Sequence, residues 1–244
     1  MSKQTGTQAG TQTGTQTGTQ TQTHTQTQTA TQTGMQLYNF HRSSASYRVR
    51  IALALKGLDY VYKPVHLSKN EQFKESYAAV SASRLVPLLQ DGEHRLTQSM
   101  AIIEYLDETH PLPPLLPPTP AGRARVRALA QDIACEIHPL DNLRVLRYLV
   151  REMKVSEDDK NRWYRHWVES GLEVVETRLA AQPSTFCHGE TPTLADCTLV
   201  PQIFNAQRFD CRLDHLPNVM RVFEACMKLP AFENTRPEKC PDAE

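Results

Sequence analysis

Residues 43–53 read Ser-Ser-Ala-Ser-Tyr-Arg-Val-Arg-Ile-Ala-Leu. The hydroxyls follow a short apolar segment and precede an amphipathic pattern that predicts a helix over residues 46–56. The first turn of a helix leaves backbone N–H groups unpaired and carries a partial positive charge. The residues alone leave two interpretations open. Either Ser44 or Ser46 simply caps the helix, or this end of the helix stabilises a thiolate or another anion.

The first 34 of the 244 residues repeat Thr-Gln, interrupted by Gly, with no large apolar residue between Met1 and Met35. Such a tract cannot bury enough apolar surface to offset its chain entropy, so we expect it to be disordered. It lacks the apolar middle of a secretory signal and the arginines of a transit peptide. No stretch approaches the length of a membrane span. These features favour a cytoplasmic protein that does not bind membranes.

Charge and cysteine content exclude several classes of function. Lys+Arg and Asp+Glu balance at 27 each, which argues against a nucleic-acid-binding surface. The six cysteines form no C-x-x-C pair and no zinc spacing with histidine, so we predict no metal. All six lie at or after Cys135. We expect a reduced protein with mostly inert thiols.

The segment from residue 35 to residue 109 predicts a small mixed sheet with helices. The predicted elements are strand 35–40, helix 46–56, strand 60–67, a polar helical stretch 71–79, strands 86–90 and 93–97, and helix 99–109. Asp91-Gly92 between the last two strands is a hairpin signal. The order requires one parallel βαβ unit and one antiparallel hairpin. Pro87 fits only at the head of its strand.

The chain after residue 109 predicts a linker and then helices only. Residues 110–120 form a proline-rich, stiff linker. The predicted helices are 121–153 with a break near His138-Pro139, one opened by Ser156 and running to Ala181, one opened by Thr193 and Asp196 and running to about Phe209, and a last one from Pro217 to Lys228. We therefore divide the chain into a tract (1–34), an α/β domain (35–117), an all-helical domain (121–235) and a tail (236–244).

These elements resemble the glutathione transferase superfamily and, more narrowly, its zeta class, the maleylacetoacetate isomerases. The matching motifs span the whole non-repetitive chain: residues 43–53, Leu85-Val86-Pro87, Gln98-Ser99, residues 101–106 (Ala-Ile-Ile-Glu-Tyr-Leu), residues 137–140 (Ile-His-Pro-Leu) and Thr193-Leu-Ala-Asp196. The resemblance implies a thioredoxin-like N-terminal domain that binds glutathione, followed by an all-helical substrate domain. It also implies a homodimer and a cis peptide bond before Pro87.

The resemblance further implies the positions that hold glutathione. Ser43 and Ser44 are the expected catalytic residues, because a hydroxyl at a helix start can stabilise the thiolate of the cofactor. The other expected glutathione contacts are the backbone of Val86, Gln98 and Ser99 for the γ-glutamyl carboxylate, His138, and Asn142. For His138 the alternative is a purely structural histidine. We assign Thr193 and Asp196 to folding.

Three arginines are the predicted partners of a small dianionic substrate, since the planar guanidinium pairs with both oxygens of a carboxylate. They are Arg42, Arg208 and Arg144. The alternative for each is a solvated surface arginine. His41 and His66 are as readily explained by exposure to solvent as by function.

The implied reaction is the glutathione-dependent cis–trans isomerisation of maleylacetoacetate to fumarylacetoacetate in aromatic amino-acid catabolism. The thiolate adds to the cis double bond, the resulting single bond rotates, and the thiolate leaves. Maleylpyruvate isomerisation in gentisate degradation, and conjugation or dehalogenation of small α-halo acids, use the same groups and stay open. A non-enzymatic interaction module is a further alternative. The class commonly has cysteine where this chain has Ala45.

Overall fold

A four-stranded mixed sheet forms the first half of the folded chain. In the computed structural model the described residues are 34–244, so the predicted disordered tract lies outside them except for Gly34. The strands are β1 (Gln36–Asn39), β2 (Val61–Pro64), β3 (Leu88–Asp91) and β4 (His94–Thr97), in the order β2-β1-β3-β4. β1 and β2 are parallel, while the β1–β3 and β3–β4 pairs are antiparallel. The predicted βαβ unit and hairpin are confirmed.

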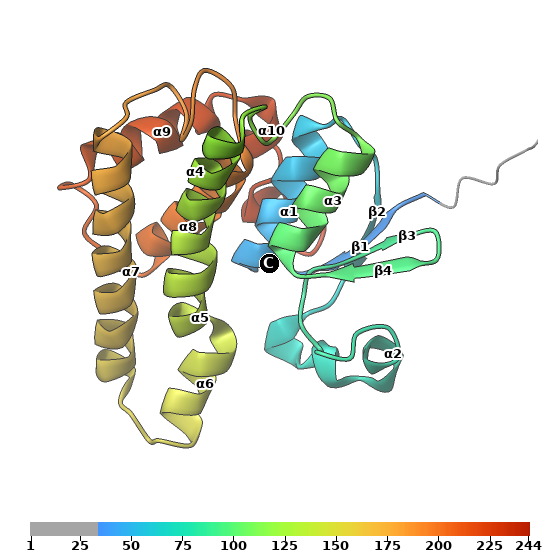
Figure 1. Cartoon of the computed structure of the whole chain (residues 1–244). Coiled ribbons are helices and arrows are strands. Elements are labelled where there is room, and N and C mark those ends of the chain that lie inside the picture. Colours follow the sequence, from blue (N-terminus) through green and yellow to red (C-terminus); the bar gives the residue numbers. More distant parts are fainter. Residues whose placement is uncertain (1–33) are drawn as a thin grey trace, which may run out of the picture. The chain divides into compact units, whose positions relative to one another are not determined.

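Helices cover both faces of this sheet. Helices α1 (Ser44–Leu55) and α3 (Ser99–Thr109) lie above the sheet in Figure 1, and the short α2 (Glu75–Ala78) lies below it. The predicted polar helix over 71–79 is wrong in extent, because a 3₁₀ turn at Glu71–Phe73 precedes a single turn of α2. Helix α1 starts two residues earlier than predicted, and Gly57 with φ of +64° ends it as expected.

Helices alone make up the second half. They are α4 (Pro120–Gln131), α5 (His138–Asp141), α6 (Leu143–Arg151), α7 (Glu157–Ala180), α8 (Leu194–Arg208), α9 (Pro217–Met227) and α10 (Pro230–Glu233). The predicted break near His138 is a π-helical segment, Asp132–Ile137, followed by a sharper interruption at Asn142. The helix from Pro217 is not the last, since α10 and a 3₁₀ turn at Pro237–Lys239 follow it.

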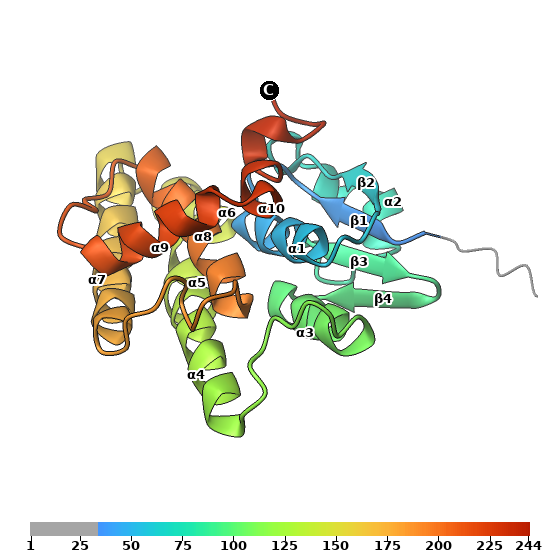
Figure 2. The same cartoon turned by 90° about the horizontal axis from the view of Figure 1, so that it is seen from above.

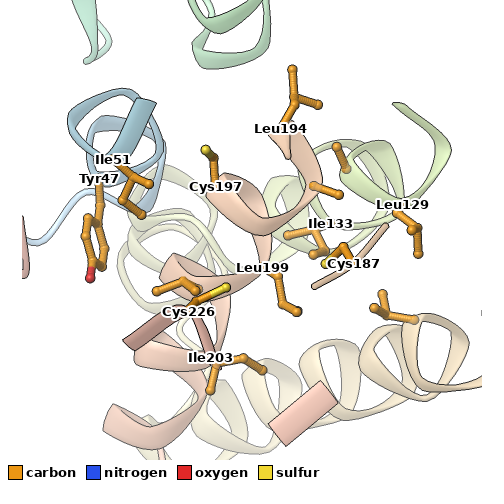
Figure 3. Close-up of a cluster of buried hydrophobic side chains, with 14 of the residues drawn as sticks. Tyr47, Ile51, Leu129, Ile133, Cys187, Leu194, Cys197, Leu199, Ile203 and Cys226 are labelled. Carbon is orange, nitrogen blue, oxygen red and sulfur yellow. The ribbon is translucent and has the colours of Figure 1, made fainter. Parts of the chain in front are cut away.

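Helix α1 joins the two halves. It packs against α3 on the sheet side and against α8 on the helical side, and Figure 2 shows it between the strands and the helical part. Its buried side chains Tyr47 and Ile51 belong to the same apolar cluster as Ile203 of α8 (Figure 3). The start of α1 is therefore held against the end of α8 by an extensive core.

Two features are absent from the described residues. Among residues 34–244, no helix combines the length and the hydropathy needed to cross a bilayer. The same residues contain no group of three His, Cys, Asp or Glu side chains arranged to hold a metal ion.

Candidate active site

The first turn of α1 presents two serines with different surroundings. Ser43 is the N-cap residue, and its Oγ accepts a hydrogen bond from the backbone N–H of Ser46 at 3.2 Å. The expectation that Ser44 or Ser46 caps the helix is therefore wrong, because the helix begins one residue after Ser43. Ser44 is buried inside the first turn instead. Capping thus occupies Ser43 and leaves Ser44 available for other contacts.

Ser44 is bonded across the boundary between the two halves. The side-chain amide of Asn205, near the end of α8, donates a hydrogen bond to Ser44 Oγ. The Asn205 Oδ1 in turn accepts from Nη1 of Arg208 at 3.1 Å. A chain of side chains therefore runs from Arg208 through Asn205 to Ser44. The sequence analysis missed Asn205, although its position one helical turn before Arg208 was a usable signal.

Arg42 and Arg208 come together beside this chain. A cavity of about 530 Å³ has both among its lining residues, which are His41, Arg42, Phe204, Arg208, Pro237, Glu238, Ala243 and Glu244. Such a volume suits a small ligand. Burial and the positive charge of Arg42 lower the pKa of Arg208. A bound anion would reduce the electrostatic repulsion between these two guanidinium groups. The cavity therefore suits a carboxylate-bearing ligand.

The tail, residues 236–244, closes one side of the cavity. Asp242 accepts hydrogen bonds from the backbone N–H of His41 at 3.2 Å and from the Tyr62 hydroxyl. Glu244 lies 3.1 Å from His66 Nε2. Both histidines are buried, so of the two interpretations left open for them, exposure to solvent is wrong. Burial lowers the pKa of His41, against the opposing influence of Asp242.

The loop before β3 offers unpaired backbone groups. The Val86–Pro87 peptide bond is cis, as expected. Within residues 34–244, neither the N–H nor the C=O of Val86 takes part in a hydrogen bond. Gln98 precedes α3 with a φ of +69° and an exposed side chain that makes no capping bond, so the first N–H groups of α3 stay open around Ser99. These groups suit a peptide with a carboxylate.

A buried arginine lies behind Ser99. Arg48 of α1 is 2% exposed, and its Nη1 donates to Ser99 Oγ at 3.3 Å. His138 and Asp141 also lie near Arg48, and His138 Nδ1 is 3.5 Å from Asp141 Oδ1. Burial and the charge of Arg48 lower the pKa of His138 to about 3. His138 is therefore neutral at pH 7 and can accept or donate a hydrogen bond.

Asn142 and Arg144 lie apart from the cavity. Asn142 caps α6, since its Oδ1 accepts from the backbone N–H of Val145 at 3.1 Å and its amide donates to the Pro139 carbonyl at 3.0 Å. Both polar atoms of the side chain are thus used within the chain. Arg144 is exposed on α6 and does not line the cavity of Arg42 and Arg208.

Comparison with known proteins identifies the family to which this chain belongs. Residues 33–108 match the glutathione S-transferase N-terminal domain, and residues 162–225 match the corresponding C-terminal domain. A probable maleylacetoacetate isomerase from Vibrio cholerae is 47% identical over 209 residues, which cover 85% of this chain and 97% of that protein. The chain belongs to the zeta class of the glutathione transferases.

Solved structures agree with this assignment. A maleylpyruvate isomerase, described as a bacterial glutathione S-transferase of the zeta class, matches with a TM-score of 0.84 and 45% identity. The match covers 86% of this chain and all of the other. A maleylacetoacetate isomerase from Anaeromyxobacter dehalogenans with glutathione in its active site matches with a TM-score of 0.79 and 45% identity, over 86% of this chain and 98% of that one. The predicted thioredoxin-like and all-helical organisation is confirmed.

Proposed function

We propose that this protein is a glutathione-dependent cis–trans isomerase that converts maleylacetoacetate to fumarylacetoacetate. The observation that carries the proposal is the convergence of Arg42 and Arg208 in one cavity, joined through Asn205 to Ser44. A dianionic maleyl compound requires two cationic partners close to the nucleophile that attacks its double bond. Relatives of this chain carry the name maleylacetoacetate isomerase, and one of them holds glutathione in its active site, which supports the proposal.

The residues fit glutathione as the cofactor. The unpaired backbone groups of Val86 can pair with the cysteinyl part, and the open start of α3 at Gln98 and Ser99 can accept the γ-glutamyl carboxylate. Arg48 adds positive charge behind Ser99. When bound there, glutathione supplies the sulfur nucleophile.

The chain's own groups prepare the reaction. The Ser44 hydroxyl, at the positive end of α1, donates a hydrogen bond that favours the ionised form of a neighbouring thiol. Arg42 and Arg208 orient the carboxylates of the substrate and stabilise the negative charge that develops on its conjugated carbonyl. Ser43 supports this geometry as the cap of the helix. His138 is proposed as a neutral hydrogen-bonding contact of glutathione, while Arg144 and Asn142 stay untested predictions.

Maleylpyruvate is the second candidate substrate. It shares the maleyl group that the two arginines would hold, and a solved relative of nearly equal identity carries the name maleylpyruvate isomerase. The ratio of kcat/KM for the two acids decides between them. We further propose that the protein is cytoplasmic and forms a homodimer. Sedimentation equilibrium of the purified protein tests the homodimer.

The decisive experiment follows the loss of the cis isomer of maleylacetone, a stable surrogate, with and without glutathione. We expect turnover only with glutathione. Arg208→Ala should raise KM about tenfold or more, because a charged hydrogen bond to the substrate contributes about 1.5–3 kcal/mol. The control is Arg162→Ala, at an exposed arginine of α7 whose one ion pair within residues 34–244 is with Asp159. Glutathione binding without turnover would contradict the isomerase and leave α-halo acids as the next substrates to test.

A further inference from the structure

The amide of Asn205 has only one orientation that satisfies its neighbours. The guanidinium of Arg208 can donate hydrogen bonds but cannot accept them. Because Arg208 Nη1 lies 3.1 Å from one amide atom of Asn205, that atom must be the oxygen. The amide nitrogen therefore faces Ser44, and it too can only donate.

This orientation determines what the Ser44 hydroxyl can do. Its oxygen receives the proton of Asn205, so its own proton must point elsewhere. Within residues 34–244 no side chain or carbonyl accepts that proton. Ser44 is 4% exposed, sits at the start of α1, and is joined through Asn205 to Arg208, which lines the cavity. The hydroxyl is thus held as a donor with no partner inside the protein.

We propose that Asn205 is a positioning residue that keeps the Ser44 hydroxyl in the donor orientation toward the sulfur of bound glutathione. The inference rests on the proposed function and deepens it. The same amide also holds Arg208, so one side chain of α8 fixes both the group that stabilises the thiolate and a group that binds the substrate. Packing of α1 against α8 keeps Ser44 and Arg208 in fixed positions relative to each other.

Asn205→Asp reverses the direction of the hydrogen bond between residue 205 and Ser44 with almost no change in the shape of the side chain. A carboxylate only accepts, so the Ser44 hydroxyl would turn toward residue 205, and Arg208 would keep its partner. The readout is the pH titration of the ultraviolet absorbance of the glutathione thiolate in the complex. We expect the pKa of bound glutathione to rise by about one unit, so that the ratio of ionised to protonated thiol at pH 7 falls about tenfold.

A double-mutant cycle separates orientation of Ser44 from a direct effect of the new charge. If Asn205 acts through Ser44, Asn205→Asp changes the titration strongly in the wild-type background and little in the Ser44→Ala background. Gln207→Glu makes the same chemical change two residues further along α8 at an exposed site and should leave the titration unchanged. Binding of glutathione by calorimetry verifies that each variant is folded.

Two results would overturn the inference. An equal change of the titration in both backgrounds would mean that the charge acts directly on the sulfur. An equal change in Gln207→Glu would mean that any negative charge on this end of α8 suffices. If wild-type protein binds no glutathione, or binds it without forming the thiolate, the proposed function itself fails, which is distinguishable from failure at Asn205 alone.

Discussion

The starts of α1 and α8 use similar residues for opposite purposes. At the start of α8, Asp196 accepts hydrogen bonds from the N–H and hydroxyl of Thr193, at 2.7 and 2.8 Å, and from the N–H of Cys187 at 2.8 Å. Every one of these donors belongs to the chain itself. At the start of α1, Ser44 receives one bond from Asn205, and its own proton has no acceptor among the described residues.

The surroundings explain the difference. Asp196 is completely buried, and Cys226 Sγ lies 3.7 Å from its Oδ1. Figure 3 shows Cys197 and Cys226 within the surrounding cluster of buried apolar side chains. A polar group there must be satisfied internally, because water cannot reach it. Ser44 is joined through Asn205 to Arg208, which lines an open cavity with Arg42, and a ligand there could complete the bonding. Polar residues at a helix start therefore indicate folding when their donors are paired in the chain, and binding when they are not.

The largest effect on stability should come from a change at the start of α8. Asp196→Ala would leave two backbone N–H groups buried without a partner, each costing about 1–3 kcal/mol. We expect Tm to fall by roughly 10 °C or more. Asp196→Asn, which keeps one acceptor, should lose less. A decrease in Tm of less than about 2 °C for the alanine variant would show that this capping box is not a major contribution to stability.

Asp141 offers a contrast between two buried carboxylates. It accepts from Gln202 Nε2 at 3.0 Å, and burial raises its pKa to about 7 despite the nearby Arg48. The folded pKa lies above the unfolded value, so between about pH 4 and 7 the folded state binds more protons than the unfolded state. Stability conferred by this group therefore falls as pH rises through that range. Asp141→Asn should remove this loss.

The measurement is the difference in Tm between Asp141→Asn and wild type from pH 4 to 8. We expect the difference to rise with pH by several degrees, on the order of 2–4 kcal/mol. His138, with its lowered pKa, acts in the opposite direction in both proteins, so it largely cancels in the difference. A difference independent of pH would contradict the raised pKa of Asp141.

Variants of Ser44 and Ser43 test the start of α1. Ser44→Ala should lower kcat/KM for maleylacetone about 10- to 100-fold, because a hydrogen bond to a charged group contributes about 1.5–3 kcal/mol. Its Tm should change little. Ser43→Ala removes the cap and should cost about 1 kcal/mol of stability, with a smaller effect on turnover. If the loss of activity were proportional to the loss of stability in both variants, the proposed difference between a binding role for Ser44 and a capping role for Ser43 would be wrong.

Most of the fold could be predicted from the sequence, for local reasons. Asp91-Gly92, Ser156 and the Thr193/Asp196 pair act within a few residues, and the hairpin and both helix starts lie where they were predicted, although β3 begins two residues later than expected. Family resemblance supplied the cis bond before Pro87. The α10 turn and the packed tail escaped prediction because they depend on contacts with residues far away in sequence, such as the bond from Tyr62 to Asp242.

The candidate site could be predicted only in part. The motif of residues 43–53 indicated the serines, and resemblance indicated Arg208. Neither indicates the Asn205–Ser44 bond, which joins residues 161 positions apart. Likewise, Arg48 resembles any amphipathic-helix arginine in sequence, and only the packing of α1 shows that it is buried behind Ser99. Pairing across the two halves is a tertiary property that no local pattern encodes.

The smallest effect concerns a second contact between the halves. Arg127 of α4 pairs with Glu104 of α3 through two hydrogen bonds of 2.9 and 2.8 Å, and both side chains are about one-third exposed. Exposed ion pairs contribute about 0–1 kcal/mol, so Glu104→Gln should lower Tm by about 2 °C or less. Turnover should not change, whereas Asn205→Asp, at the contact with Ser44, should affect turnover more than stability. High salt should reduce the effect of Glu104→Gln, because screening weakens an exposed pair. A loss of turnover in Glu104→Gln would mean that any weakening of this boundary disturbs the site, and that Asn205 has no special position in it.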